Sequence, residues 1–291
     1  MSEFRFDKNK DEIHFIDDTI NKVMKETKYG ITFSKSDILN MMESKVTVDL
    51  SSFTPQDELN PKIWAEDGIM NSRVRLRLLD IADEFVDSLD VEWVEVEDII
   101  LTGSLANYNW SKFSDFDVHI IMDFKKVDER TDFVTNYFNS KKKIWNNEHE
   151  NLKIYGFPVE LYVQDKNEEH TSSGVYSLEK NEWVKEPEKE TFENVKMNTK
   201  FIKQKTKDLI DKIDDLSDRI EKETDEHKLE VLSRCVKAVF DKIKGLRKEG
   251  LKKSGEFNTF NILFKVLRRM GYIDKLYNLK LNTYDKIKSL K

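Results

Sequence analysis

The 291-residue sequence has almost no cysteine and lacks any long apolar run. Its single cysteine, Cys235, excludes an internal disulfide and fits a reducing cytoplasm. Apolar neighbours at helical spacing indicate that Cys235 is a buried core thiol rather than a nucleophile. No run approaches the ~20 apolar residues that span a bilayer, and the charged first fifteen residues contain no apolar segment of a secretory signal. We therefore expect a cytoplasmic protein with no membrane partner.

Charged residues make up 36% of the chain and divide unevenly along it. Residues 1–190 contain 24 Lys/Arg against 40 Asp/Glu, whereas residues 191–291 contain 25 against 16. An acidic N-terminal part and a basic C-terminal part predict two regions with different partners, although two solvated surfaces would give the same pattern. The length allows one large domain or two ordinary ones.

Hydrophobic periodicity divides the chain into an N-terminal part with both helices and strands and a C-terminal part with helices only. Before residue 188 it predicts helices at 10–27, after Ser34, from Asn71 to near Asp90 and at 132–145, a turn-rich linker at 47–61, and strands at 91–103, 115–124, 156–165, 172–178 and 182–186. After Pro187 it predicts helices at 190–223, 225–248, 257–270 and 273–289. We expect a domain boundary near residue 188.

Two carboxylates lie two residues apart in the stretch GSLANYNWSKFSDFDVHII, residues 103–121. Alternate side chains of a strand share a face, so Asp115, Asp117 and His119 project together while Phe116 and Val118 face the core. Close carboxylates repel each other, and no basic residue on the strand offsets them. A hard divalent cation such as Mg²⁺ removes this repulsion and is held by carboxylates together with substrate phosphates. A solvated strand end or a Ca²⁺ site is the alternative.

A third acidic residue completes a two-metal site, in which the ions lie ~3.5–4 Å apart. Glu160 is suitable, because it alternates with the apolar residues Val159 and Leu161 on a later strand. The alternative is an exposed residue on an edge strand. His119 shares the acidic face and is expected to be a hydrogen-bonding scaffold residue.

The pair Gly103-Ser104 ends the strand that precedes the two carboxylates. Gly103 has no side chain, so phosphates can approach the backbone, and Ser104 opens a short helix whose N–H groups and hydroxyl suit phosphate oxygens. Ser104 is also an ordinary N-cap, and both roles use the same geometry. This loop and the acidic strand together predict in-line attack of a hydroxyl on the α-phosphorus of an NTP, with release of pyrophosphate.

Residues 90–165 resemble the DNA polymerase β-like nucleotidyltransferase superfamily. The resemblance lies in three features that occur in order: Gly103-Ser104, the Asp115-x-Asp117 pair and a carboxylate on a later strand. The form SDFD, with Ser114 before the first aspartate, is also similar to that family. The resemblance implies an α+β fold: a small mixed, largely antiparallel nucleotidyltransferase sheet with flanking helices, followed by an all-α C-terminal domain. It implies that Gly103 and Ser104 bind the triphosphate, with Ser114 beside them. It also implies that Asp115 and Asp117 bind metal.

The third carboxylate is open within this resemblance. The superfamily often has Asp there, and Asp165 lies near Glu160, but alternation favours Glu160 because it puts this residue mid-strand, away from the core-facing valines. Residues 58–188 are similar to nucleotidyltransferase-like proteins of large tailed bacteriophages, which implies a host-cytoplasmic location and no particular substrate. The expected domains are N-terminal helices and a linker (1–57), a catalytic domain (58–188) and a helical domain (189–291).

Three further residues are candidates for nucleotide binding. Tyr176 could stack on the base, with plain strand packing as the alternative. The resemblance implies that Lys200 or Lys203 contacts the triphosphate from the following helix, with a solvated helix face as the alternative. Basic residues near the C-terminus could neutralise RNA phosphates. They are Lys265, Arg268, Arg269 and Lys275.

The resulting hypothesis is a template-independent nucleotidyltransferase that uses two Mg²⁺ ions, or Mn²⁺, to move an NMP from an NTP to an acceptor hydroxyl. The basic helical region slightly favours an RNA 3′ end as the acceptor. Alternatives are a protein-nucleotidylating (AMPylating) enzyme, a synthase of oligonucleotide signals, an antibiotic-modifying transferase and a non-catalytic nucleotide-binding phage accessory protein. The sequence predicts neither the NTP nor the oligomeric state.

Overall fold

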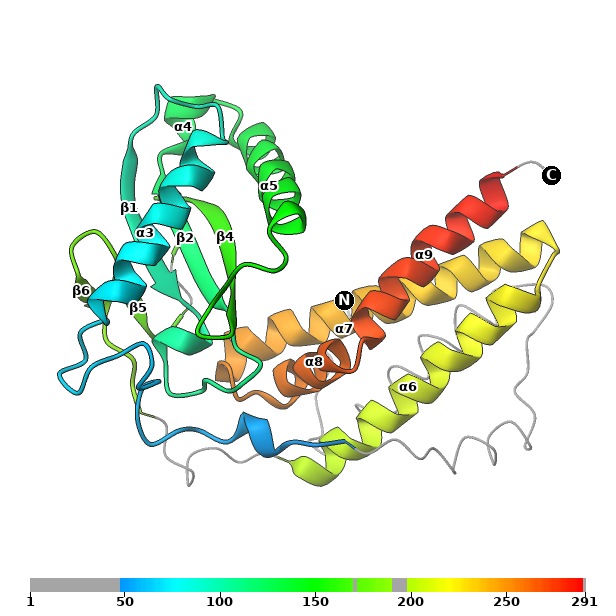
Figure 1. The fold of residues 1–291 in the computed structure, drawn as a ribbon. Coiled ribbons are helices and arrows are strands. Elements are labelled where there is room, and N and C mark those ends of the chain that lie inside the picture. The colour runs from blue at the N-terminus through cyan, green and yellow to red at the C-terminus, as the bar shows by residue number, and fades with distance from the viewer. Residues whose placement is uncertain (1–47, 170–171, 190–197, 290–291) are drawn as a thin grey trace, which may run out of the picture. The chain divides into compact units, whose positions relative to one another are not determined.

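The computed structural model describes residues 48–169, 172–189 and 198–289. The helices expected at residues 10–27 and after Ser34 lie outside this part of the chain. The described residues form two compact units, one within Ser51–Val195 and the other containing those of Lys196–Lys291. Elements of both units are labelled in Figure 1.

The first unit is built on a sheet of six strands in the order β3-β4-β2-β1-β5-β6. The strands are β1 (Val96–Thr102), β2 (Phe116–Met122), β3 (Lys153–Ile154), β4 (Phe157–Asp165), β5 (Val175–Ser177) and β6 (Glu182–Lys185). β2 and β4 run parallel, and every other neighbouring pair is antiparallel. The expectation of a mixed, largely antiparallel sheet with flanking helices and a C-terminal helical region is confirmed.

Two helices, α3 (Ser72–Asp87) and α5 (Thr131–Glu148), pack on one face of this sheet (Figure 1). Asn71 begins α3 because its side chain accepts a hydrogen bond from the backbone N–H of Arg73. The helices and the sheet bury a common apolar core. Its fully buried members include Leu78, Phe85, Leu101, Phe116, Val118, Ile120, Val134 and Leu161. The opposite face of the sheet is therefore the one on which polar side chains can gather.

The strand expected at residues 91–103 is shorter in the structure, because β1 begins only at Val96. Residues 91–95 form a turn in which Val91 and Val94 are nevertheless buried. Their apolar spacing reflects a loop packed on the core rather than a strand. Three short elements were not expected, the 3₁₀ helix η2 (Ser51–Phe53), the helix α4 (Phe124–Val127) and the two-residue strand β3, because none is long enough to show a period.

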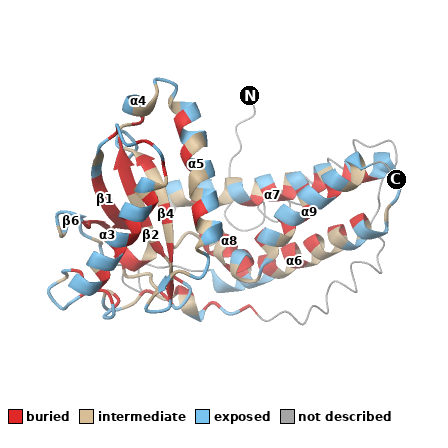
Figure 2. Ribbon diagram, turned by 45° about the horizontal axis from the view of Figure 1, so that its top comes forward, coloured by how far each residue is buried: buried red, intermediate tan, exposed pale blue. Residues whose placement is uncertain are grey.

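The second unit contains four helices among its described residues. They are α6 (Thr199–Lys222), α7 (Glu226–Ser254), α8 (Thr259–Arg269) and α9 (Tyr272–Lys288). Figure 2 shows buried residues recurring along α6 between exposed ones, as a helix with one apolar face requires. Cys235 lies in the shared core of this unit, so the expectation of a buried core cysteine is confirmed, and burial raises the pKa of its thiol. None of the described helices is long and apolar enough to cross a membrane.

Candidate active site

Three carboxylates converge at the end of the sheet where β2 and β4 begin. Asp117 and Glu160 are direct neighbours in the parallel register of β2 and β4, and Asp115 immediately precedes β2. Each of the three offers an oxygen atom, and these atoms all lie within 4.8 Å of one another. We call this group the acidic cluster. The register, which the sequence alone does not give, places Glu160 beside the aspartate pair.

The strand alternation that was expected around the acidic cluster is present. Phe116 and Val118 are fully buried on the core face, whereas Asp117 and His119 between them are half-buried on the opposite face. On β4, Leu161 is fully buried, and Glu160 is half-buried on the face it shares with Asp117. The carboxylates are therefore partly open to solvent while their strands are fixed by the core.

Asp165, the other candidate for the third carboxylate, lies at the far end of β4. Five residues of extended strand, at ~3.3 Å each, separate it from Glu160. Its Oδ1 accepts hydrogen bonds from the backbone N–H and the side-chain amide of Asn167, at 3.1 and 2.8 Å. Asp165 therefore stabilises the turn after β4, and Glu160 is the residue that the structure brings to the aspartates.

Gly103 forms a cradle around Asp117 that no other residue can form. Its backbone has φ 75° and ψ −159°, a conformation essentially restricted to glycine. Thr102, the residue before it, pairs with Asp117 in the register of β1 and β2. A Cβ placed on Gly103 would lie 2.0 Å from Oδ2 of Asp117 and 2.9 Å from its Cγ. The glycine thus allows the backbone turn and the Asp117 carboxylate to occupy adjacent positions.

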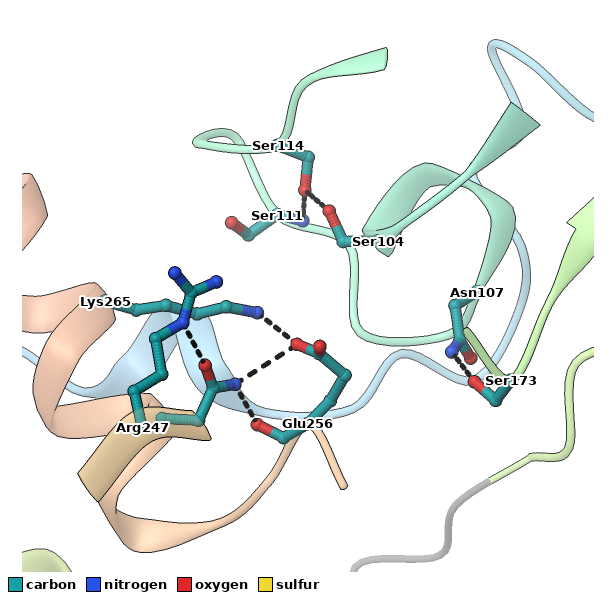
Figure 3. Close-up of polar contacts among 9 residues, drawn as sticks. Ser104, Asn107, Ser111, Ser114, Ser173, Arg247, Glu256 and Lys265 are labelled. Carbon is teal, nitrogen blue, oxygen red and sulfur yellow. Dashed lines mark hydrogen bonds and ion pairs between the residues drawn. The ribbon is translucent and has the colours of Figure 1, made fainter. Parts of the chain in front are cut away.

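Ser104 and Ser114 hold the loop before β2 against the glycine turn (Figure 3). The Ser104 hydroxyl donates to Ser114 Oγ at 2.7 Å, and the backbone N–H of Ser111 donates to the same oxygen at 3.0 Å. Ser114 is buried, whereas Ser104 is half-buried. In this arrangement Ser114 braces the loop, and Ser104 is the hydroxyl nearer to solvent.

The short helix expected after Gly103 is one 3₁₀ turn, η3 (Ser104–Ala106). A single turn has little macrodipole, so attraction of phosphate by a helix end is weaker than the sequence suggested. Trp64 fixes this turn by donating from Nε1 to the carbonyl of Leu105 at 2.8 Å. Phosphate binding here would depend on the Gly103-Ser104 backbone and the Ser104 hydroxyl.

Residues 173 and 174 support the same turn, a role that sequence reasoning missed. The side-chain amide of Asn107 donates to the Ser173 hydroxyl (Figure 3). A Cβ on Gly174 would lie 1.9 Å from the carbonyl oxygen of Ala106, so only glycine allows this approach. The turn-like pattern before β5 indicated a loop, but its partners Asn107 and Ala106 lie 66 and 68 residues earlier in the chain and were not visible in the sequence.

A second polar layer lies beside the acidic cluster. Tyr162 donates its hydroxyl to Glu160 Oε2 at 2.5 Å, and its ring stacks on His119 with centroids 4.8 Å apart. The ammonium of Lys142, on α5, lies 3.3 Å from the centroid of the same ring. His119 is within 2.7 Å of Gln164 Oε1 through Nδ1, which fits the scaffold role expected for it. Lys142 was missed because the contact joins a helix to a strand.

The electrostatics of this layer follow from burial and from the carboxylates. Burial raises the pKa of the Tyr162 phenol, and the negative charges of Asp117 and Glu160 raise it further, so it stays a hydrogen-bond donor. Burial lowers the pKa of the Lys142 ammonium, while Glu160 and Asp117 act in the opposite direction. The charges of Glu160 and Asp117 therefore act on Lys142, whose Nζ lies over the tyrosine ring.

Other candidates lie away from the acidic cluster or in the other unit. Tyr176 is fully buried between Trp64 and Trp183, its hydroxyl accepts from the Met70 N–H at 3.3 Å, and its ring has no exposed face on which a base could stack. This placement corrects the stacking role considered for Tyr176 and is that of a core residue. Lys200 and Lys203 are exposed on α6, in the second unit, and their contact with triphosphate stays a prediction.

The C-terminal basic residues are partly engaged in ion pairs. Lys265 lies 2.5 Å from Glu256 (Figure 3), and Lys275 lies 2.6 Å from Asp214. Burial raises the pKa of Glu256, but Lys265, Asn261 and Arg247 together outweigh it and the net pKa is lowered. These pairs reduce the positive charge that the region offers to phosphates.

The donor set fits a divalent cation. Three carboxylates supply only hard oxygen ligands, the type that Mg²⁺ and Mn²⁺ prefer, and their mutual repulsion favours binding of positive charge. The absence of a side chain at Gly103 lets the Asp117 carboxylate lie against the turn, since a Cβ there would be 2.0 Å from Oδ2. Both observations agree with a metal-binding role for the acidic cluster.

A protein-family model matches the part of the chain that contains this cluster. Residues 82–186 match the family model described as nucleotidyltransferase domain. The matched segment contains β1 to β6, the Gly103-Ser104 turn and the whole acidic cluster. Comparison with curated proteins and with solved structures found no match. The nucleotidyltransferase domain implies an NTP substrate, and with the three acidic residues it indicates metal-assisted transfer.

Proposed function

We propose that the protein is a Mg²⁺-dependent, template-independent nucleotidyltransferase of the polymerase β-like type. It moves an NMP from an NTP to an acceptor hydroxyl and releases pyrophosphate. The observation that carries this proposal is the acidic cluster, formed by register between parallel strands and set against a glycine turn that admits no side chain. The nucleotidyltransferase domain match over residues 82–186 supports it.

Each part of the site has a separate task. Asp115, Asp117 and Glu160 would hold two divalent ions, which supply charge neutralisation for the phosphates and activation of the attacking hydroxyl. Gly103 lets the backbone approach the phosphates, and the Ser104 hydroxyl would exchange its bond to Ser114 for a phosphate oxygen. The buried strands keep the ligands in place, so little reorganisation is needed when substrate binds.

We propose an RNA 3′ end as the acceptor. A hollow of about 820 Å³ in the first unit lies between α3 and the β3–β4 hairpin. Its lining includes Arg73, Leu76, Arg77, Asp80, Lys153 and Tyr155. Although this part of the chain is acidic, three of these residues are basic, and Leu76 and Tyr155 are exposed at 61% and 48%. Cations beside an exposed aromatic ring suit phosphates and unstacked bases, so this hollow, which is lined by none of the acidic cluster, would hold RNA away from its reacting 3′ end.

The experiment is incubation with each labelled NTP, Mg²⁺ or Mn²⁺, and total bacterial RNA. Label on RNA supports the proposal, whereas label only on protein or in a new nucleotide overturns the RNA acceptor and keeps the transferase. NTP binding without any transfer overturns catalysis altogether. Asp117→Ala should abolish transfer without lowering the metal-free melting temperature, because it removes one of several repelling carboxylates. Asp165→Asn is the matched control and should transfer normally.

A further inference from the structure

The acidic cluster combines two short ligands with one long one. Asp115 and Asp117 each have two side-chain torsions, whereas Glu160 has three. A longer side chain loses more conformational freedom when it is fixed in one geometry. Unless another group restrains it, the Glu160 carboxylate would be the least ordered of the three ligands.

Tyr162 supplies such a restraint. It lies two residues after Glu160 on β4, so both side chains project from the same face of the sheet. Its hydroxyl donates to Glu160 Oε2 at 2.5 Å. One carboxylate oxygen is thereby tied, and the rotation of the carboxylate about its last torsion is fixed. The other oxygen, Oε1, keeps its lone pairs for a metal ion.

The tyrosine ring is itself held from two neighbouring elements. His119 is its register partner on β2, and the two rings are nearly parallel, with an interplanar angle of 18°. Lys142 reaches the ring from α5 and makes a close cation–π contact with it. Both supports are half-buried and come from parts of the chain fixed by the core. Packing of the ring therefore fixes the direction in which the Tyr162 hydroxyl points toward Glu160.

We propose that Tyr162 is a positioning residue that orders the Glu160 carboxylate for metal binding, and that Lys142 and His119 hold its ring in place. The inference rests on the proposed function, because it assigns a role within the same site. Groups that hydrogen-bond to metal ligands typically change metal affinity by about 10–100-fold when removed.

The test is Tyr162→Phe, which keeps the ring and removes only the hydroxyl. We expect Mn²⁺ affinity, measured by calorimetry or electron paramagnetic resonance, to fall about 10-fold. Tyr137→Phe is the matched control, because the Tyr137 hydroxyl donates to the carbonyl of Leu89 at 2.6 Å and lies outside the site. That variant should lose a similar amount of thermal stability but bind Mn²⁺ normally.

A double-mutant cycle separates positioning from general loosening of the fold. Glu160→Asp shortens the ligand so that it no longer reaches the hydroxyl, and Tyr162→Phe should then have no further effect on Mn²⁺ affinity. Equal Mn²⁺ affinity in Tyr162→Phe and the intact protein overturns the inference. Glu160→Gln distinguishes a failure of the proposed metal site from a failure of the role of Tyr162. If Glu160→Gln leaves Mn²⁺ binding unchanged, the proposed metal site itself fails. If it weakens binding while Tyr162→Phe does not, only the role of Tyr162 fails.

Discussion

Replacing Gly103 by alanine tests the geometry of the site most directly. The backbone at φ 75° and ψ −159° costs a non-glycine residue about 1–3 kcal/mol. The added Cβ would also lie 2.0 Å from Oδ2 of Asp117, whereas ordinary contacts are at least 3.4 Å. The carboxylate must therefore move by about 1 Å or more. A displacement of that size at a reacting centre costs about 100-fold in rate.

Gly156 provides a matched control for this substitution. It has a φ of 89° in the turn between β3 and β4, and a Cβ there would have no atom within 4 Å. Both alanine variants should therefore unfold at lower temperature, because both carry backbone strain. Only Gly103→Ala should also lose Mn²⁺ affinity and nucleotidyl transfer. If Gly103→Ala matches Gly156→Ala in Mn²⁺ binding, the cradle argument is wrong.

Two further predictions concern groups outside the acidic cluster. Tyr176→Phe leaves the Met70 N–H without its acceptor and should cost about 1–3 kcal/mol of unfolding free energy. Its NTP affinity should be unchanged, and a weakened NTP affinity would restore a binding role. Hydrogen bonds from the Arg130 side chain and backbone lower the pKa of Asp128 from 3.8 to about 2. This pair therefore stabilises the fold above pH ~4 and loses its effect as the pH falls toward 2. NMR titration of Arg130→Met should show that pKa rising toward 3.8, and an unchanged value would contradict the ion pair.

Much of the fold followed from periodicity. The helix from Asn71 is α3, and the strands around Gly103, Asp117 and Glu160 are β1, β2 and β4. Long or strictly alternating patterns of this kind are set by burial of one face, which the sequence records directly. The strand prediction was wrong at residues 91–95, because a buried loop can also place apolar residues at regular intervals. The pair of residues in β3 is too short to carry any period.

The candidate site was predictable where neighbours in sequence are neighbours in space. The sequence determined that Asp115 and Asp117 share a face, because alternation is a local property of a strand, and that a glycine turn precedes them. Alternation already favoured Glu160 over Asp165, but only the tertiary structure, through the parallel register of β2 and β4, places Glu160 beside Asp117 and Asp165 five residues away. The contacts of Tyr162 were equally inaccessible, because they join β2, β4 and α5, and no local pattern encodes how separate elements meet.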